Sequence, residues 1–151
     1  MSQLSETSTI RFYDNHADEY VSGTVGVDME SLYRPFLELV PEGGMILDAG
    51  SGSGRDTKAF LDRGYRVTAI DASANMVEAT TRRTGQPAKQ MRFQGLEDRN
   101  EFDAIWACAS VLHVSLDELD DVLERFAAAL RPGGDLTPSR CTSGNERIIR
   151  I

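Results

Sequence analysis

A glycine-rich turn, Asp48-Ala49-Gly50-Ser51-Gly52-Ser53-Gly54, follows the short apolar run Met45-Ile46-Leu47 and leads into a predicted helix over 55–63. A strand that feeds such a turn and then a helix N-terminus brings main-chain N–H groups and the positive helix end close to a ligand. Asp71 ends the next apolar run, 21 positions after Gly50. A carboxylate at that place accepts hydrogen bonds from a ribose in nucleotide-binding α/β units. The spacing therefore predicts an α/β fold with a nucleoside ligand.

The positions of the glycines argue against two other nucleotide motifs. The dinucleotide pattern G-x-G-x-x-G needs its third glycine where Arg55 or Thr57 stands. The phosphate-binding pattern G-x-x-x-x-G-K-[ST] is absent, and Lys58 lies in the predicted helix outside that frame. What remains is an acidic residue followed by alternating glycines. A dinucleotide-dependent oxidoreductase is thus the weakest alternative.

Four segments resemble, in order and at fitting intervals, the motifs of class I S-adenosylmethionine-dependent methyltransferases. The segment 46–54 resembles the first motif and 67–73 the second, while 102–107 resembles the fourth strand and 130–134 the turn before the fifth. Within the superfamily the chain is similar to small bacterial tellurite-resistance-like or ubiquinone-biosynthesis-like members. The resemblance implies a Rossmann-like sheet with helices on both faces, S-adenosylmethionine as cofactor, S-adenosylhomocysteine as product and a small-molecule methyl acceptor.

The resemblance and the chemistry of this cofactor imply roles for individual residues. Asp48 is expected to engage the methionine ammonium through water, and Asp71 to bind the ribose hydroxyls. The main chain at 50–54 is expected to lie against the ligand and meet its carboxylate, because glycine has no Cβ in the way. The predicted cofactor-binding residues are Tyr13, Tyr20, Asp48, Gly50, Ser51, Gly52, Gly54, Arg55, Asp71, Ala72, Met76, Gln94, Gly95, Leu96 and Cys108.

Four of these positions leave alternatives open. Tyr13 and Tyr20 match aromatic positions that cap the pocket in resembling proteins, but packing of an N-terminal helix explains them equally well. Met76 matches a residue that packs on the adenine, and a core methionine is the alternative. Many resembling proteins carry an acidic residue at the position of Gly95, where it accepts from the adenine amino group. Here Gln94 or backbone groups are left for that role.

No catalytic residue is predicted. Cys108 is expected to run beneath the sulfonium and the methyl group, and His113 acts either as a general base or in packing. Methyl transfer can proceed mainly by positioning of the two reactants, without an acid or base from the protein. A non-catalytic protein that binds S-adenosylmethionine therefore remains the alternative to an enzyme.

Length and composition limit the class of protein. The 151 residues are 40% hydrophobic and 26% charged, which is typical of one globular domain. The net charge of −8 argues against a nucleic-acid partner, because phosphate contacts need a basic surface. The sequence shows no membrane span or signal pattern, and its two cysteines make neither a metal set nor a disulfide framework. A cytoplasmic protein is expected.

Local patterns predict the order of the elements. The single domain 1–151 divides into N-terminal cap helices (1–44), an α/β core (45–134) and an atypical tail (135–151), with the first eight residues frayed. Ser73 is the expected N-cap of a helix, and Ser115-x-x-Glu118 is a capping box at the start of another. The further predicted elements are a helix over 10–20 and strands over 65–70, 90–93 and 102–107.

The tail departs from the methyltransferase pattern. After Gly134 the segment is mostly polar, and Pro138 removes a donor from any sheet ladder. The expectation is a sheet of order 3-2-1-4 with at most a poor fifth strand, lacking the last strands of the family. An edge left open in this way allows copies of the chain to associate. In resembling proteins the part that is absent here often supplies a wall of the acceptor pocket.

Overall fold

The computed structural model describes residues 6–17, 28–107, 114–137 and 149–150. At its centre lies a six-stranded sheet with the order β3-β2-β1-β4-β5-β6. Strands β1 to β5 pair in parallel, and β6 pairs antiparallel to β5. The strands are Met45–Ala49 (β1), Arg66–Asp71 (β2), Lys89–Gln90 (β3), Phe102–Trp106 (β4), Leu130–Thr137 (β5) and Ile149–Arg150 (β6).

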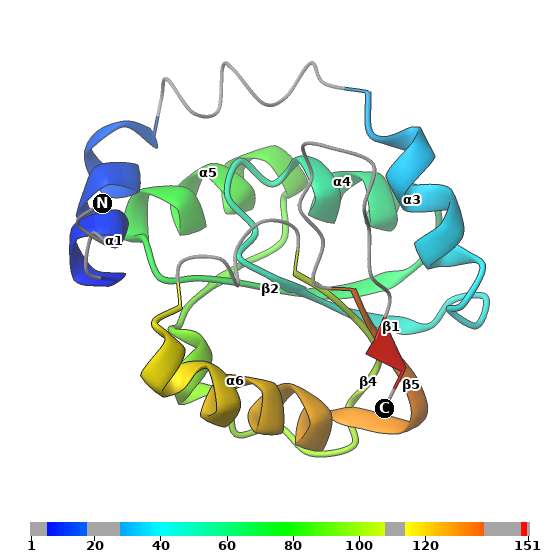
Figure 1. The fold of residues 1–151 in the computed structure, drawn as a ribbon. Coiled ribbons are helices and arrows are strands. Elements are labelled where there is room, and N and C mark those ends of the chain that lie inside the picture. Colours follow the sequence, from blue (N-terminus) through cyan, green and yellow to red (C-terminus); the bar gives the residue numbers. More distant parts are fainter. Residues whose placement is uncertain (1–5, 18–27, 108–113, 138–148, 151) are drawn as a thin grey trace.

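Helices cover both faces of the sheet (Figure 1). One face carries α3 (Glu30–Leu37), α4 (Arg55–Asp62) and α5 (Ala74–Thr84), and the other carries α6 (Leu116–Ala129). The first helix, α1 (Glu6–Asn15), lies beside α5. The predicted α/β class with helices on both faces of a Rossmann-like sheet is confirmed.

Alternation of side chains along the inner strands builds a core on each face. Leu47 and Ile105 are fully buried in one cluster together with Phe126 of α6. Ile46 and Trp106 point to the opposite face, because successive side chains of a strand alternate, and they pack in a second cluster against α3 and α4. The strands are thus buried on both faces, which explains their continuous apolar runs.

Several predicted boundaries differ from the structure. The first helix already begins at Glu6, inside the segment that was expected to fray. The third strand is only Lys89–Gln90, and the chain then enters a 3₁₀ helix, η1 (Phe93–Gly95). Phe93 leaves the sheet because its ring packs edge-on against Phe126 of α6, with centroids 5.4 Å apart.

The two predicted caps differ in outcome. Ser73 is the N-cap of α5, and its Oγ accepts from the amide of Met76 at 3.3 Å, which confirms the prediction. Ser115 is the N-cap residue of α6, but its side chain accepts no main-chain hydrogen bond. Its Oγ instead donates to the Glu118 carboxylate at 3.1 Å, so the capping box is wrong in its hydrogen bonds.

The predicted strand order 3-2-1-4 is confirmed, and the sheet continues past β4 further than the poor fifth strand that the sequence predicts. β5 pairs with β4 at Phe102↔Leu130 and again from Ala104↔Asp135 onward, with a register shift between the two. The shift leaves 131–134, the Arg-Pro-Gly-Gly segment, outside the ladder, so Pro132 interrupts no pairing. β6 then pairs with β5. A full fifth strand and a short antiparallel strand are therefore present.

The sheet places the glycine turn where α/β proteins bind ligands. The strand order reverses at β1, which has β2 on one side and β4 on the other. In open α/β sheets the crevice outside the carboxyl ends of the strands at such a point is the usual ligand site. Within the described ranges, no helix has the length and apolar character needed to cross a membrane. In those ranges no cluster of three or more His, Cys, Asp or Glu side chains is arranged for a metal ion.

Candidate functional site

The glycine turn after β1 is a tightly bonded piece of backbone. Gly52 (φ +54°) and Gly54 (φ +82°) hold left-handed angles that residues with a side chain rarely adopt. The amides of Gly50 and Ser51 both donate to the Ile70 carbonyl, at 2.9 and 3.0 Å. The Gly54 amide donates to the Ser51 carbonyl at 2.9 Å. These N–H groups are hydrogen-bonded within the chain. The turn therefore lets a ligand come close to the main chain more than it offers that ligand free donors.

Asp71, at the end of β2, is joined directly to the turn. Its Oδ2 accepts from the Gly52 amide and its Oδ1 from the Ser73 amide, each at 2.9 Å. Burial raises the pKa of Asp71 above its usual value, against the lowering effect of those amides. The Ala72 amide lowers this pKa as well. Since a carboxylate has about four acceptor sites, at least one remains for a hydroxyl donor. The structure therefore brings the two predicted motifs together.

Asp48, at the end of β1, is buried beneath the turn. Its exposed fraction is 1%, and Thr57 Oγ1 of α4 donates to its Oδ2 at 2.5 Å. Burial, and then the negative charge of Asp56, raise the pKa of Asp48 to about 8, while the Thr57 bond lowers it. The carboxyl group is therefore largely protonated near neutral pH. A cation placed beside it would favour the ionised form.

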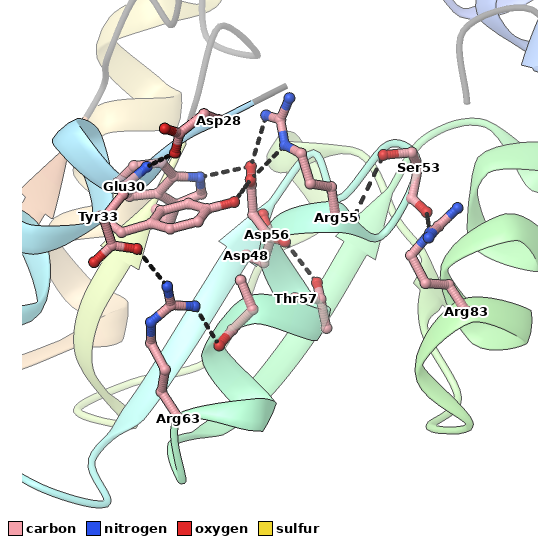
Figure 2. A network of polar contacts seen from close by, with 12 residues as sticks. Asp28, Glu30, Tyr33, Asp48, Ser53, Arg55, Asp56, Thr57, Arg63 and Arg83 are labelled. Atoms are coloured by element: carbon pink, nitrogen blue, oxygen red, sulfur yellow. Dashed lines mark hydrogen bonds and ion pairs between the residues drawn. The ribbon is translucent and has the colours of Figure 1, made fainter. Parts of the chain in front are cut away.

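A second buried carboxylate, Asp56, gathers three donors that the sequence analysis did not connect (Figure 2). Trp106 Nε1 donates to its Oδ2 at 2.9 Å, and Arg55 Nε donates to its Oδ1 at 2.8 Å. The Tyr33 hydroxyl also donates to Oδ1. Burial and the charge of Asp56 raise the pKa of Tyr33, which keeps its hydroxyl protonated as a donor. This cluster, Tyr33, Arg55, Asp56 and Trp106, holds Arg55 beside the turn.

The first helix is tied to the same region through Asp14. Asp14 Oδ1 accepts from Ser73 Oγ at 2.9 Å and from the Asn75 amide at 3.0 Å. A carboxylate at the first turn of α5 is favoured by the helix dipole. Asp14, for which no motif predicts a role, anchors α1 next to the carboxyl end of β2.

The remaining predicted residues are distributed unevenly around the turn. Ser51 is buried beside it, and Leu96 belongs to the core cluster on the α6 face. Met76 is 1% exposed, the burial that the core-methionine alternative predicts. Ala72 and Gln94 are half-buried, while Gly95 is exposed.

Some predictions fall outside the residues that can be assessed. Tyr13 lies in the α1 backbone, but its side chain is outside the described part of the structure. Tyr20, Cys108 and His113 also lie outside the described residues. Their predicted roles stay predictions.

Comparison with known proteins identifies the family. A family model described as "Methyltransferase domain" matches residues 46–134, more than half of the chain. The chain belongs to this methyltransferase family. The matched region begins in β1 and ends in β5, so it contains both the glycine turn and Asp71. The resemblance to class I S-adenosylmethionine-dependent methyltransferases is thereby confirmed.

Three relatives illustrate the similarity. The malonyl-[acyl-carrier protein] O-methyltransferase of Enterobacter lignolyticus (strain SCF1) is 33% identical over 93 residues, which are 60% of this chain and 36% of that protein. DhpI in complex with SAH is 26% identical with a TM-score of 0.70, covering 99% of this chain and 80% of that one. The 1,6-didemethyltoxoflavin-N1-methyltransferase of Burkholderia thailandensis, solved with 1,6-didemethyltoxoflavin and S-adenosylhomocysteine, is 27% identical with a TM-score of 0.62. The match covers 87% of this chain and 61% of that enzyme.

The chain is shorter than these relatives. It spans little more than a third of the curated malonyl-[acyl-carrier protein] O-methyltransferase. What the similarity shows is therefore the family and the fold of the shared region.

Proposed function

We propose that this domain binds S-adenosylmethionine at the carboxyl ends of β1 and β2 and transfers its methyl group to a small-molecule acceptor. The observation that carries the proposal is the 2.9 Å bond between the Gly52 amide and Asp71, which joins the two cofactor motifs into one site. Family membership supports the reaction class. The toxoflavin-precursor enzyme, with its small-molecule substrate and S-adenosylhomocysteine, supports the class of acceptor.

The residues present fit this cofactor. Asp71 keeps an acceptor site for a ribose hydroxyl, which is a donor. Arg55, held by Asp56 beside the turn, is the cation that we assign to the methionine carboxylate. Asp48 suits the positive end of the ligand, since the ammonium and the sulfonium both favour an ionised carboxylate. Because the amides of Gly50, Ser51, Gly52 and Gly54 are bonded within the chain, we assign carboxylate recognition to Arg55 in place of the main chain.

The chemistry needs little from the protein beyond placement. Bound S-adenosylmethionine supplies a methyl group on a positively charged sulfur, ready for in-line attack by a nucleophile. The turn and Asp71 fix the nucleoside, and Arg55 fixes the amino-acid end. Holding two reactants in line lowers the barrier without an acid or base from the chain. No residue is assigned a proton-transfer role.

A non-catalytic domain that binds S-adenosylmethionine is the second candidate. The observation that favours it is Gly95, which is exposed and has no side-chain acceptor for the adenine amino group. In this candidate the cofactor site serves binding or interaction without turnover. Two expectations from the sequence stay proposals. They are that copies of the chain associate through a sheet edge and that the protein is cytoplasmic.

Calorimetric titration of the purified protein tests the proposal. We expect binding of S-adenosylmethionine and S-adenosylhomocysteine, no binding of NAD, and loss of binding in Gly52→Val and Asp71→Ala. Gly64→Val is the matched control, because Gly64 (φ +89°) is another left-handed glycine but lies at the far end of α4. Binding of NAD alone, or full affinity in Gly52→Val, would refute the site.

Turnover separates the two candidates. The wild-type protein is incubated with S-adenosylmethionine and a panel of small thiol, amine, phenol and carboxylate acceptors, and S-adenosylhomocysteine is measured. Acceptor-dependent formation of S-adenosylhomocysteine is the result that we expect. Tight cofactor binding without turnover on any acceptor would favour the non-catalytic candidate.

A further inference from the structure

The helix α5 makes a side-chain contact with the glycine turn through Thr80. Its Oγ1 lies 3.1 Å from the Gly52 carbonyl oxygen and 2.9 Å from Ser51 Oγ, and Thr80 is fully buried. A carbonyl oxygen can only accept, so the single Thr80 hydroxyl proton goes to Gly52. Ser51 must then donate its proton to Thr80. The three groups form a directed chain of hydrogen bonds, Ser51 to Thr80 to the Gly52 carbonyl.

Two further contacts fix the next residues of the turn against the same helix. Arg83 Nε, one turn along α5, donates to the Ser53 carbonyl at 3.0 Å (Figure 2). Gly54 lies so close to α5 that a Cβ built on it would stand 2.8 Å from Thr80 Cα. Consecutive carbonyls of the turn therefore face α5 and are held there.

The opposite side of the turn is held by the strand that precedes α5. The Gly50 and Ser51 amides donate to Ile70, and the Gly52 amide donates to Asp71. The amides of residues 50–52 and the carbonyls of residues 52 and 53 are thus bonded by one β2–α5 unit. Because left-handed glycines are intrinsically free to change conformation, it is this second unit that selects one conformation.

We propose that Thr80, assisted by Arg83, is a positioning residue that fixes the glycine turn in the conformation that receives the cofactor. The identity of the ligand rests on the proposed function, whereas the effect of Thr80 on the conformation of the turn does not depend on it. Thr80 holds the Gly52 carbonyl while Asp71 holds the Gly52 amide. Loss of the Thr80 hydroxyl frees the peptide plane between Gly52 and Ser53.

Main-chain hydrogen exchange, followed by NMR without ligand, tests this role directly. Exchange of a protected amide reports how often its local structure opens. In Thr80→Val we expect the Gly52 and Gly54 amides to exchange roughly three- to tenfold faster, the size of one net hydrogen bond. The amide of Ile105 in β4 should keep its wild-type rate. Arg83→Gln should produce a similar, turn-restricted increase.

Two variants on the same helix serve as controls. Thr80→Ser keeps the hydroxyl and should restore wild-type exchange at Gly52. Thr81→Val removes a hydroxyl that donates to the Val77 carbonyl at 2.9 Å and accepts from the Ala88 amide at 3.1 Å, away from the turn. It should leave the turn amides unchanged.

Titration with S-adenosylmethionine adds the functional readout. We expect the dissociation constant to rise roughly three- to tenfold in Thr80→Val and Arg83→Gln, and to stay at the wild-type value in Thr80→Ser. Wild-type exchange rates at the turn in both Thr80→Val and Arg83→Gln, or equal acceleration in Thr81→Val, would overturn the positioning role. If Thr80→Val does not fold, the exchange rates of the turn amides in Arg83→Gln and Thr80→Ser decide whether the positioning role holds. A wild-type protein that does not bind the cofactor would refute the proposed function, while the exchange rates still decide this inference.

Discussion

Replacing Asp56 by asparagine removes the charge at the centre of the buried cluster while keeping its size. The carboxylate accepts from Tyr33 and Arg55 on Oδ1 and from Trp106 on Oδ2. An amide has one oxygen, so if that oxygen faces Tyr33 and Arg55, its NH₂ group faces the Trp106 N–H at hydrogen-bond distance. The substitution thus sets donor against donor in a largely buried site.

The expected loss of stability follows from these contacts. A buried donor left without an acceptor costs about 1–3 kcal/mol, and the bond from Arg55 loses the charge of its acceptor. The free energy of unfolding should therefore fall by about 3 kcal/mol. For a domain of this size each kcal/mol lowers Tm by about 2–4 °C, so Tm should fall by about 6–12 °C.

Urea denaturation, monitored by the fluorescence of Trp106, measures the change. Trp106 is the sole tryptophan and belongs to the cluster. Asp62→Asn is the matched control, because it is the same substitution on the same helix. Asp62 pairs with Lys58 at 2.6 Å, but its side chain is 58% exposed, and such pairs contribute about 0–1 kcal/mol. If Asp56→Asn unfolds at the same urea concentration as Asp62→Asn, the cluster does not carry the stability assigned to it.

Two further predictions concern the pH dependence and the adenine end of the site. Since the pKa of Asp48 is raised to about 8 from 3.8, the folded state holds a proton that the unfolded state releases, and unfolding free energy should fall as pH rises from about 4 to 8. Asp48→Asn should reduce the slope of that decline by up to about 1.4 kcal/mol per pH unit. Urea denaturation across the pH range measures the slope, and parallel curves of unfolding free energy against pH for the variant and the wild type would contradict the prediction. A Cβ on Gly95 would meet only Met91 Cγ at 3.5 Å, so Gly95→Asp should fold and bind S-adenosylmethionine about fivefold tighter by calorimetry. Gly95→Ala, which adds the Cβ without an acceptor, should bind as the wild type does, and an equal gain in both variants would exclude an adenine hydrogen bond.

The parts of the fold that sequence predicted are those whose signal is local. The glycine turn, the strands around it and the Ser73 cap each depend on a few adjacent residues, and each is found where expected. β5 was missed because its pairing depends on a partner far along the chain. The polar residues after Gly134 and Pro138 argue against a strand, yet Asp135 to Thr137 pair with β4, and Pro138 lies outside the described residues.

The candidate site was predicted to a similar extent. Asp71 and the turn were found by spacing, which places them at neighbouring strand ends. The role of Asp56 was missed because its partners Tyr33 and Trp106 lie 23 and 50 positions away. An acidic residue in the first turn of a helix is common, since the helix dipole favours it, so its type and position do not predict buried donors around it.

Hydrogen bonds link the first helix to the glycine turn through a single intermediate element. Asp14 of α1 holds the start of α5 through Ser73 and Asn75. Thr80, two turns along the same helix, holds the Gly52 carbonyl. Because a helix transmits a displacement along its axis almost rigidly, a shift of α1 against α5 would reach the turn. Hydrogen bonds therefore connect the segment predicted to cap the cofactor pocket with the cofactor turn through α5.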